Sequence, residues 1–228
     1  MDENPVLNVK SLKSQVYEYL REQMRRGDIL PGSVIDMEET SQKLGVSKTP
    51  LRDALLQLEM EHFVTILPRR KVVVNVLTVQ DIRNYYQIIG ALESTALLAG
   101  FDKIEGTEIE AMARLNAGMK EAVEQNDFDL YYERNLAFHN TFLNPCGNAY
   151  LIEIVNVLKK RLYDFPRQKG FVKEWEATSV GEHARLLEAI RERRPLEAAN
   201  FIRDVHWSFE VQEKFIEKYY NHSPITES

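Results

Sequence analysis

The stretch GVSKTPLRDALLQL, residues 45–58, predicts a helix with a well-defined beginning. Ser47 is a favoured N-cap residue, and Pro50 falls in the first turn, where its missing N–H does little harm. Apolar residues then recur at helical spacing and predict a buried stripe made of Leu51, Ala54, Leu55 and Leu58. One side of this helix is therefore expected to face a protein core.

The opposite side of the same helix begins with Lys48, Thr49 and Arg52. Lys48 and Arg52 are four residues apart and therefore share a face. Arg and Lys suit guanine edges and phosphates, and Thr suits a phosphate or a thymine methyl group. In a helix-turn-helix, the second helix of the motif enters the major groove by its N-terminal end. These three residues are therefore predicted to bind DNA.

The preceding residues complete such a motif. Apolar residues four apart predict a helix that begins near Ser11 and ends at Gly27. Residues 29–35 are typical of a turn, with Pro-Gly at their centre. Residues 36–45 predict a short helix, with Asp36 as its N-cap.

A β-hairpin is predicted over residues 64–76, where two β-rich runs flank a turn. Arg69, Arg70 and Lys71 lie at its tip and would contact the DNA backbone or the adjacent minor groove. Either cationic element alone could be a solvated surface, but together they match one fold. Three helices and a hairpin predict a winged helix-turn-helix DNA-binding domain over residues 1–77.

After Thr78 the sequence changes character, because no further strand pattern follows. Helical periodicity extends over six stretches, near residues 78–100, 105–126, 128–144, 148–166, 172–193 and 195–220. Residues 78–228 are therefore predicted to form an all-helical bundle of six or seven helices. The expected fold class is mainly α.

Charge and composition limit the function classes. The net charge is −6, but residues 1–77 hold 11 Lys and Arg against 11 Asp and Glu, so the negative excess lies in the second domain. A neutral domain with clustered cations can still bind a polyanion. No apolar run approaches the roughly 20 residues of a membrane span, and the N-terminus lacks a signal-peptide core. Cys146 is the only cysteine. We expect a cytoplasmic protein without an internal disulfide.

Three histidines lie within apolar helices of the second domain: His139, His183 and His206. Asn135 and His139 are four residues apart, so both could touch one ion. Imidazole is the commonest side-chain metal ligand, whereas a lone buried histidine is more often a hydrogen-bonded core residue. Spacing between separate helices says nothing about convergence, so the residues alone leave both interpretations open.

Residues 11–77 resemble the GntR family of bacterial transcription regulators. The matching pieces are RRGDILPGSVI, EETSQKLGVSKTPLRDALLQLE and the hairpin. Lys48 falls where many members carry Arg, and Arg52 matches the family's Arg. His62 and Lys71 stand where glycines are usual, and Glu38 stands where some members carry a basic residue that contacts DNA.

Residues 78–220 resemble the FCD ligand-binding domain of FadR-type GntR regulators. The matching pieces are ALESTALLA, NLAFHNTFLNPCGNAYL, GEHARLLEAIRERRPLEAA and DVH. The resemblance implies one divalent metal ion, with ligands at Asn135, His139, His183 and His206. The family's usual residue at the first of these positions is Asp, and an amide brings no negative charge. Three imidazoles and one oxygen suit Zn, Ni, Co or Fe better than Mg or Ca, with Zn or Ni as first candidates.

A second departure concerns effector binding. Many FCD domains carry an Arg at the position of Ile89, and that Arg often faces the effector. We hypothesise that Arg203, on roughly the same helix face as His206, replaces this anion anchor. The alternative is that Arg203 reaches the surface or pairs with an acid of the bundle.

The resemblance implies a homodimeric regulator rather than an enzyme, with repressor as the default. Two recognition helices would read an inverted repeat in double-stranded DNA, and a small carboxylate at the metal would control operator affinity. One alternative is a metal-free regulator with the three histidines as core residues. The other is a three-histidine metallohydrolase, against which no H-E-x-x-H helix is present.

Overall fold

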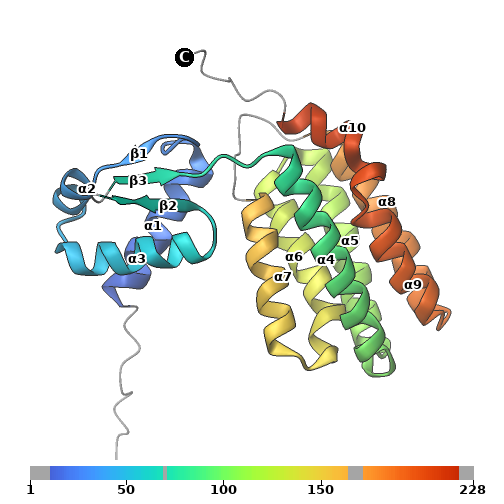
Figure 1. Cartoon of the computed structure of the whole chain (residues 1–228). Coiled ribbons are helices and arrows are strands. Elements are labelled where there is room, and N and C mark those ends of the chain that lie inside the picture. Colours follow the sequence, from blue (N-terminus) through green and yellow to red (C-terminus); the bar gives the residue numbers. More distant parts are fainter. Residues whose placement is uncertain (1–10, 69–70, 164–171, 221–228) are drawn as a thin grey trace, which may run out of the picture. The chain divides into compact units, whose positions relative to one another are not determined.

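The computed structural model describes residues 11–68, 71–163 and 172–220. The chain divides into two compact units, with the main boundary between Leu77 and Thr78 (Figure 1). Each unit is described by itself.

Helices and a small sheet make up the first unit. Its elements are α1 (Leu12–Arg26), β1 (Val34–Ile35), α2 (Met37–Leu44), α3 (Lys48–Met60), β2 (Val64–Leu67) and β3 (Lys71–Val74). The Ser11 side chain caps α1 by accepting a hydrogen bond from the N–H of Ser14, and Gly27 ends that helix in the left-handed conformation. Asp36 caps α2 through the N–H groups of Glu38 and Glu39. The winged helix-turn-helix prediction is confirmed.

The sheet has the order β1-β3-β2 and is antiparallel throughout. The predicted hairpin is therefore present, but a third strand is added from the segment that the sequence predicted as a turn. Val34 and Ile35 pair with Val73 and Val72, so the residues after the Pro-Gly turn extend the sheet. Successive residues of a strand point to opposite faces, so Val72 and Val74 of β3 are buried together. The buried stripe of α3 lies in the same core, with Leu20, Met24 and Phe63.

The second unit is helical in all of its described regular elements. These are α4 (Val79–Gly100), α5 (Gly106–Gln125), α6 (Phe128–Leu143), α7 (Ala149–Tyr163), α8 (Lys173–Arg191), α9 (Pro195–Phe201) and α10 (Phe209–Tyr220), with short 3₁₀ turns at Phe101–Lys103 and Asn144–Cys146. Figure 1 shows α4 lying beside α6 and beside the C-terminal helices. The mainly α fold class is confirmed.

The final predicted helix, 195–220, is wrong as a single element. It is divided into α9 and α10 by a π-helical turn, Ile202–His206. Ser208 then begins a new helix, because its hydroxyl accepts a hydrogen bond from the N–H of Val211. A π turn changes the rotation of the following residues about the helix axis, and such turns are frequent at functional sites.

Close packing holds this π turn against α4. A Cβ atom added at Gly90 would lie 3.0 Å from the Cβ of Trp207 and 3.5 Å from the Cα of Arg203. Glycine at this position therefore lets the backbone of the π turn approach α4, which brings His206 and Trp207 toward the bundle core.

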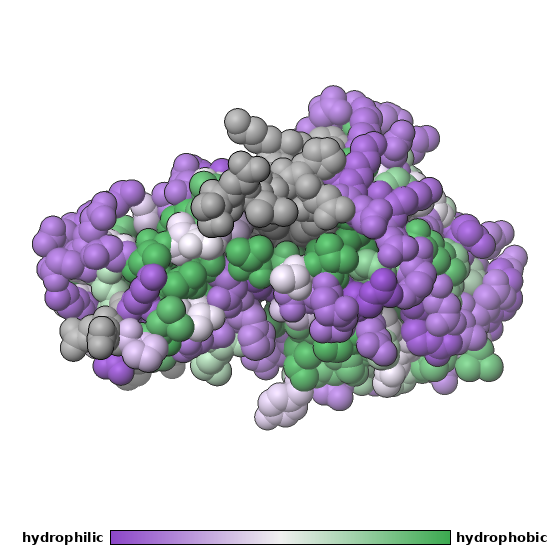
Figure 2. Space-filling model, turned by 45° about the horizontal axis from the view of Figure 1, so that its top comes forward, coloured by the Kyte–Doolittle hydropathy of each residue, from purple (hydrophilic) through white to green (hydrophobic). Residues whose placement is uncertain are grey.

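Among the described residues, the mainly apolar bundle core contains a buried polar cluster that includes Glu93, Asn135, His139, Lys159 and His183. In the view of Figure 2, hydrophilic residues cover much of the surface shown, and apolar residues are exposed in smaller patches between them. Among the described residues, none of the helices combines the length and apolar character needed to cross a membrane.

Candidate nucleic-acid interface and metal centre

The first turns of α3 present the three residues predicted to read DNA. Lys48, Thr49 and Arg52 are all exposed. They line a groove of about 1040 Å³ between α2, α3 and the hairpin strands, together with residues that include Met37, Glu38, Asp53, Glu59 and Leu67. Exposed side chains at the N-terminal end of the second helix of the motif are what major-groove reading requires.

Lys48 and Arg52 differ in their partners. The Lys48 ammonium forms an ion pair with the Glu38 carboxylate, which also accepts a hydrogen bond from the Gln42 amide at 3.3 Å. The hydrogen bond from Lys48 lowers the pKa of Glu38. Within the described part of the chain, Arg52 forms no ion pair.

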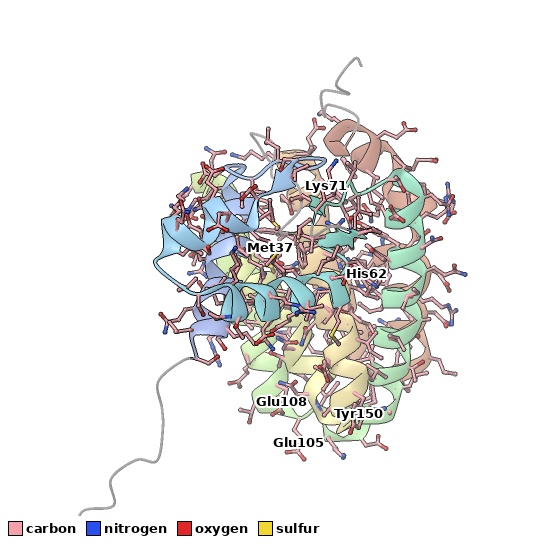
Figure 3. All side chains as sticks on the ribbon, turned by 60° about the vertical axis from the view of Figure 1, so that its left-hand side comes forward. Met37, His62, Lys71, Glu105, Glu108 and Tyr150 are labelled. Atoms are coloured by element: carbon pink, nitrogen blue, oxygen red, sulfur yellow. The ribbon has the colours of Figure 1, made fainter. Side chains whose placement is uncertain are left out.

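The hairpin tip lies partly outside the described residues. Arg69 and Arg70 are not among them. Lys71 begins β3, where it pairs with Leu67 of β2, and it is exposed. Figure 3 labels Lys71 and also Met37, which lines the groove beside α3.

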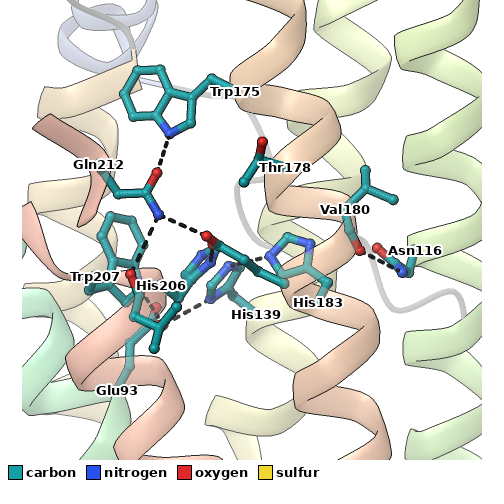
Figure 4. Close-up of polar contacts among 12 residues, drawn as sticks. Glu93, Asn116, His139, Trp175, Thr178, Val180, His183, His206, Trp207 and Gln212 are labelled. Atoms are coloured by element: carbon teal, nitrogen blue, oxygen red, sulfur yellow. Dashed lines mark hydrogen bonds and ion pairs between the residues drawn. The ribbon is translucent and has the colours of Figure 1, made fainter. Parts of the chain in front are cut away.

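Three histidines converge in the core of the second unit. His139 comes from α6, His183 from α8 and His206 from the last residue of the π turn, and one ring nitrogen of each lies within 4.8 Å of the others. All three are buried. The Nε2 atoms of His139 and His183 are 3.3 Å apart (Figure 4). This convergence could not be read from their positions in the sequence.

A buried carboxylate orients His139. Glu93 Oε2 lies 2.8 Å from Nδ1 of His139 and accepts a second hydrogen bond, also 2.8 Å, from the indole N–H of Trp207. Burial would raise the pKa of Glu93, but the contacts with His139 and Lys159 outweigh it and hold the pKa well below its usual range. An ionised carboxylate can only accept, so Nδ1 of His139 carries the proton and Nε2 presents its lone pair.

A second carboxylate orients His206 in the same way. Glu182 Oε2 lies 2.7 Å from Nδ1 of His206, and Glu182 Oε1 accepts a hydrogen bond of 2.9 Å from the Gln212 amide. Gln212 in turn accepts a hydrogen bond of 3.0 Å from the indole N–H of Trp175 (Figure 4). The chain of contacts ties the start of α8 and the buried face of α10 to His206. It leaves Nε2 of His206 as the nitrogen available to a ligand.

His183 lacks such an orienting group among the described residues, because its Nδ1 has no hydrogen-bond partner there. Its Nε2–H can donate to the lone pair on Nε2 of His139, which explains the contact between these two atoms. Burial lowers the pKa of His183 well below its ordinary value, and the neighbouring histidines and Lys159 act in the same direction. Burial likewise lowers the pKa of His139 to about 3. Both imidazoles are therefore neutral at pH 7.

Asn135 lies one turn before His139 on α6 and is buried, so both side chains belong to one face of that helix. A buried lysine, Lys159 of α7, pairs with Oε1 of Glu93, and its Nζ lies 5.5 Å from the centre of the Trp207 ring. Sequence reasoning missed Glu93, Glu182, Lys159 and Gln212. The one signal for Glu93 and Lys159 was a charged residue placed inside an apolar periodic helix.

Arg203 reaches the surface and pairs with an acid, as in the alternative interpretation given above. Its side chain is 48% exposed, and its guanidinium binds the Asp204 carboxylate at 2.7 Å and the Asn200 amide oxygen at 2.9 Å. It would have to leave Asp204 before it could bind an effector. The described contacts therefore do not support the effector role predicted for Arg203.

The donor set fits a transition-metal ion. Neutral imidazole nitrogens are preferred ligands of Zn, Cu, Fe and Ni, and metal-bound histidines usually donate their other N–H to a carboxylate or carbonyl. Two of the three histidines already do so. Three such nitrogens within reach of one another leave further coordination positions for Asn135, water or an effector.

Comparison with known proteins assigns both units. Residues 12–74 match the family model described as bacterial regulatory proteins, gntR family, and residues 84–205 match the FCD domain. The HTH-type transcriptional repressor GlaR of Escherichia coli K12 is 25% identical over 206 residues, 88% of this chain and 90% of its own. An HTH-type transcriptional regulator of Agrobacterium vitis is 30% identical over 133 residues, 57% of this chain and 78% of its own.

Solved structures share the fold. Escherichia coli McbR/YncC matches with a TM-score of 0.69 and 20% identity over 93% of this chain and 99% of its own. A GntR regulator from Rhodococcus sp. RHA1 matches with a TM-score of 0.72 and 17% identity over 92% and 100%. The relatives are transcription regulators and not enzymes, so the metallohydrolase alternative is set aside. The chain belongs to the GntR family of DNA-binding transcription regulators, with an FCD domain after its winged helix-turn-helix.

Proposed function

We propose that this regulator is a homodimeric repressor whose operator affinity is controlled by a small carboxylate bound at a divalent metal ion in the FCD domain. His139, His183 and His206 would hold the ion, with Asn135 as an additional oxygen ligand. The observation that carries the metal site is the convergence of three buried imidazole nitrogens within 4.8 Å, two of them oriented by carboxylates.

The formal charges of the buried cluster favour an anionic effector. Imidazoles that ligate a metal are neutral, and Asn135 brings no charge. Glu93 and Glu182 bring two negative charges, and Lys159 brings one positive charge. A divalent ion would give the cluster a net charge of +1. Since an unbalanced buried charge is costly, a monocarboxylate would bind favourably by cancelling it. Zn or Ni suits this nitrogen-rich ligand set best.

The described contacts also suggest which groups the effector meets. Lys159 is buried and carries three N–H donors, whereas Arg203 is exposed and engaged with Asp204. Lys159 is therefore the cation that we propose for the effector, although it is itself paired with Glu93. An effector acts only through a difference in affinity between the DNA-competent and DNA-incompetent states.

Repression and operator symmetry follow from the relatives and from general geometry. GlaR and RspR of Escherichia coli are both named as repressors. A two-fold dimer with one recognition helix per subunit matches an inverted repeat. A metal-free regulator is the second candidate, because the hydrogen bond between His139 and His183 can form without an ion.

Arg52 is expected to contact a base, because it is exposed in the groove and unpaired by any acid among the described residues. Selection of bound DNA from a random pool should yield an inverted repeat. Arg52→Ala should weaken binding to that operator by about 1–3 kcal/mol and relax specificity at one position per half-site. Lys120→Ala, which removes an exposed cation from α5, is the charge-matched control. Equal affinities of parent and Arg52→Ala would remove Arg52 from the readout.

Protein purified without an affinity tag should contain about one transition-metal ion per chain by elemental analysis. His183→Ala should lose this ion, since two imidazoles and one amide hold a divalent cation weakly. Asn135→Asp should hold it more tightly against a competing chelator, because a carboxylate adds a negative ligand. Stoichiometric metal in His183→Ala, or none in the parent after reconstitution with Zn or Ni, would favour the metal-free regulator.

Metal-free protein should lose stability on mild acidification. His139 and His183 stay neutral in the folded protein but bind protons in the unfolded chain as the pH falls below 6.5. The unfolded state then holds more protons, so the free energy of unfolding falls by about 1.4 kcal/mol per pH unit for each histidine. Urea unfolding from pH 7 to 5 measures this slope. His62→Asn should leave it unchanged, because His62 is exposed and Asn accepts its positive φ. A flat profile would contradict neutral, buried histidines.

A further inference from the structure

The groove beside α3 is lined by several acidic residues, which is unexpected for a surface that binds DNA. Asp36, Glu38, Asp53 and Glu59 line it together with Lys48 and Arg52. A duplex presents a dense array of negative phosphates, so each uncompensated carboxylate on this surface opposes binding. An acid retained here therefore needs a reason.

Two of these acids have structural tasks. Asp36 caps α2 by accepting hydrogen bonds of 2.8 Å from the N–H groups of Glu38 and Glu39. Glu59 accepts a hydrogen bond of 2.7 Å from the backbone N–H of Ile66 and so joins α3 to β2. Glu38 has no comparable backbone contact among the described residues.

Glu38 is instead engaged with a predicted DNA-binding residue. Its carboxylate pairs with the Lys48 ammonium, and the Gln42 amide fixes it from the next turn of α2. The two side chains are 59% and 52% exposed, so their ion pair adds little to stability. The consequence of the contact therefore lies in what Lys48 can bind.

A paired lysine and glutamate discriminate between the two surfaces of DNA. Phosphates offer only negatively charged acceptors, which attract Lys48 but repel Glu38. Base edges in the major groove offer acceptors beside donors, for example guanine O6 and N7 beside the N4 amino group of cytosine. On the DNA, a phosphate therefore suits only Lys48, whereas base edges can offer a partner to each member of the pair.

We propose that Glu38 is a specificity-determining residue, which holds Lys48 back from the phosphate backbone and thereby lowers affinity for DNA of any sequence. Arg52 has no acid partner in the described part of the chain, so its guanidinium is not restrained in this way. The protein gives up non-specific affinity and keeps a donor and an acceptor side by side for base edges.

The test is a double-mutant cycle on the full chain, with a duplex of random sequence as the probe. Glu38→Gln should raise affinity roughly five- to tenfold at about 0.1 M salt and steepen the plot of log K against log salt by about 0.9, because one additional phosphate contact releases about one counterion. Glu39→Gln is the matched control. Glu39 is the neighbouring exposed acid in the first turn of α2, and no ion pair to Lys48 is formed by it.

Lys48→Ala completes the cycle. It should have little effect on non-specific affinity in the parent and should abolish the gain in the Glu38→Gln background. The proposal is overturned if Glu38→Gln behaves like Glu39→Gln, if it binds more weakly than the parent, or if its gain persists without Lys48. Fluorescence anisotropy over a KCl series distinguishes these outcomes.

Discussion

The helical domain depends on one kind of interaction, a buried carboxylate that accepts the Nδ1 proton of a histidine. Glu93 does this for His139 and Glu182 does it for His206. Each contact fixes a tautomer and a ring orientation, so that Nε2 lone pairs point to a common place before any ion arrives. The cost is two buried negative charges, which Lys159 and the N–H donors of Trp207 and Gln212 offset.

The residues that support these contacts come from several helices. Glu93 belongs to α4, Lys159 to α7, Trp207 follows the π turn, and Gln212 belongs to α10. Binding of an ion or effector at the site would therefore affect several helices at once, because the buried polar groups cannot replace a lost partner with water. This coupling gives a physical basis for the effector control that we propose.

The sequence predicts the elements better than the site. Helical spacing places α3 and its buried leucines correctly, because apolar periodicity is a local property. The short strand β1 was missed, since two residues after a turn carry no periodic signal. The π turn was missed because the apolar pattern of residues 195–220 continues through it. Only the resemblance to FCD domains could group the three histidines into one site, because the convergence of α6, α8 and the π turn depends on tertiary packing.

Charged groups were the hardest to predict. Lys159 stands within KKRLY, where a lysine is usually solvated, yet it is buried beside Glu93. Arg203 is the candidate anion anchor because it lies three residues before His206 in the sequence, but the π turn breaks the regular helical relation on which that spacing argument depends. The ion pair of Glu38 and Lys48 joins two helices, so the sequence pattern of neither helix alone predicts it.

The most direct test of this account is the tautomeric state of the histidines in the metal-free protein, read from the nitrogen chemical shifts of the imidazole rings by NMR at pH 7. The account predicts a neutral ring for His139, protonated at Nδ1 with the lone pair on Nε2, and a proton on Nδ1 of His206. Protonation of His139 at Nε2, an imidazolium at His139, or a His206 ring without a proton on Nδ1 would contradict it.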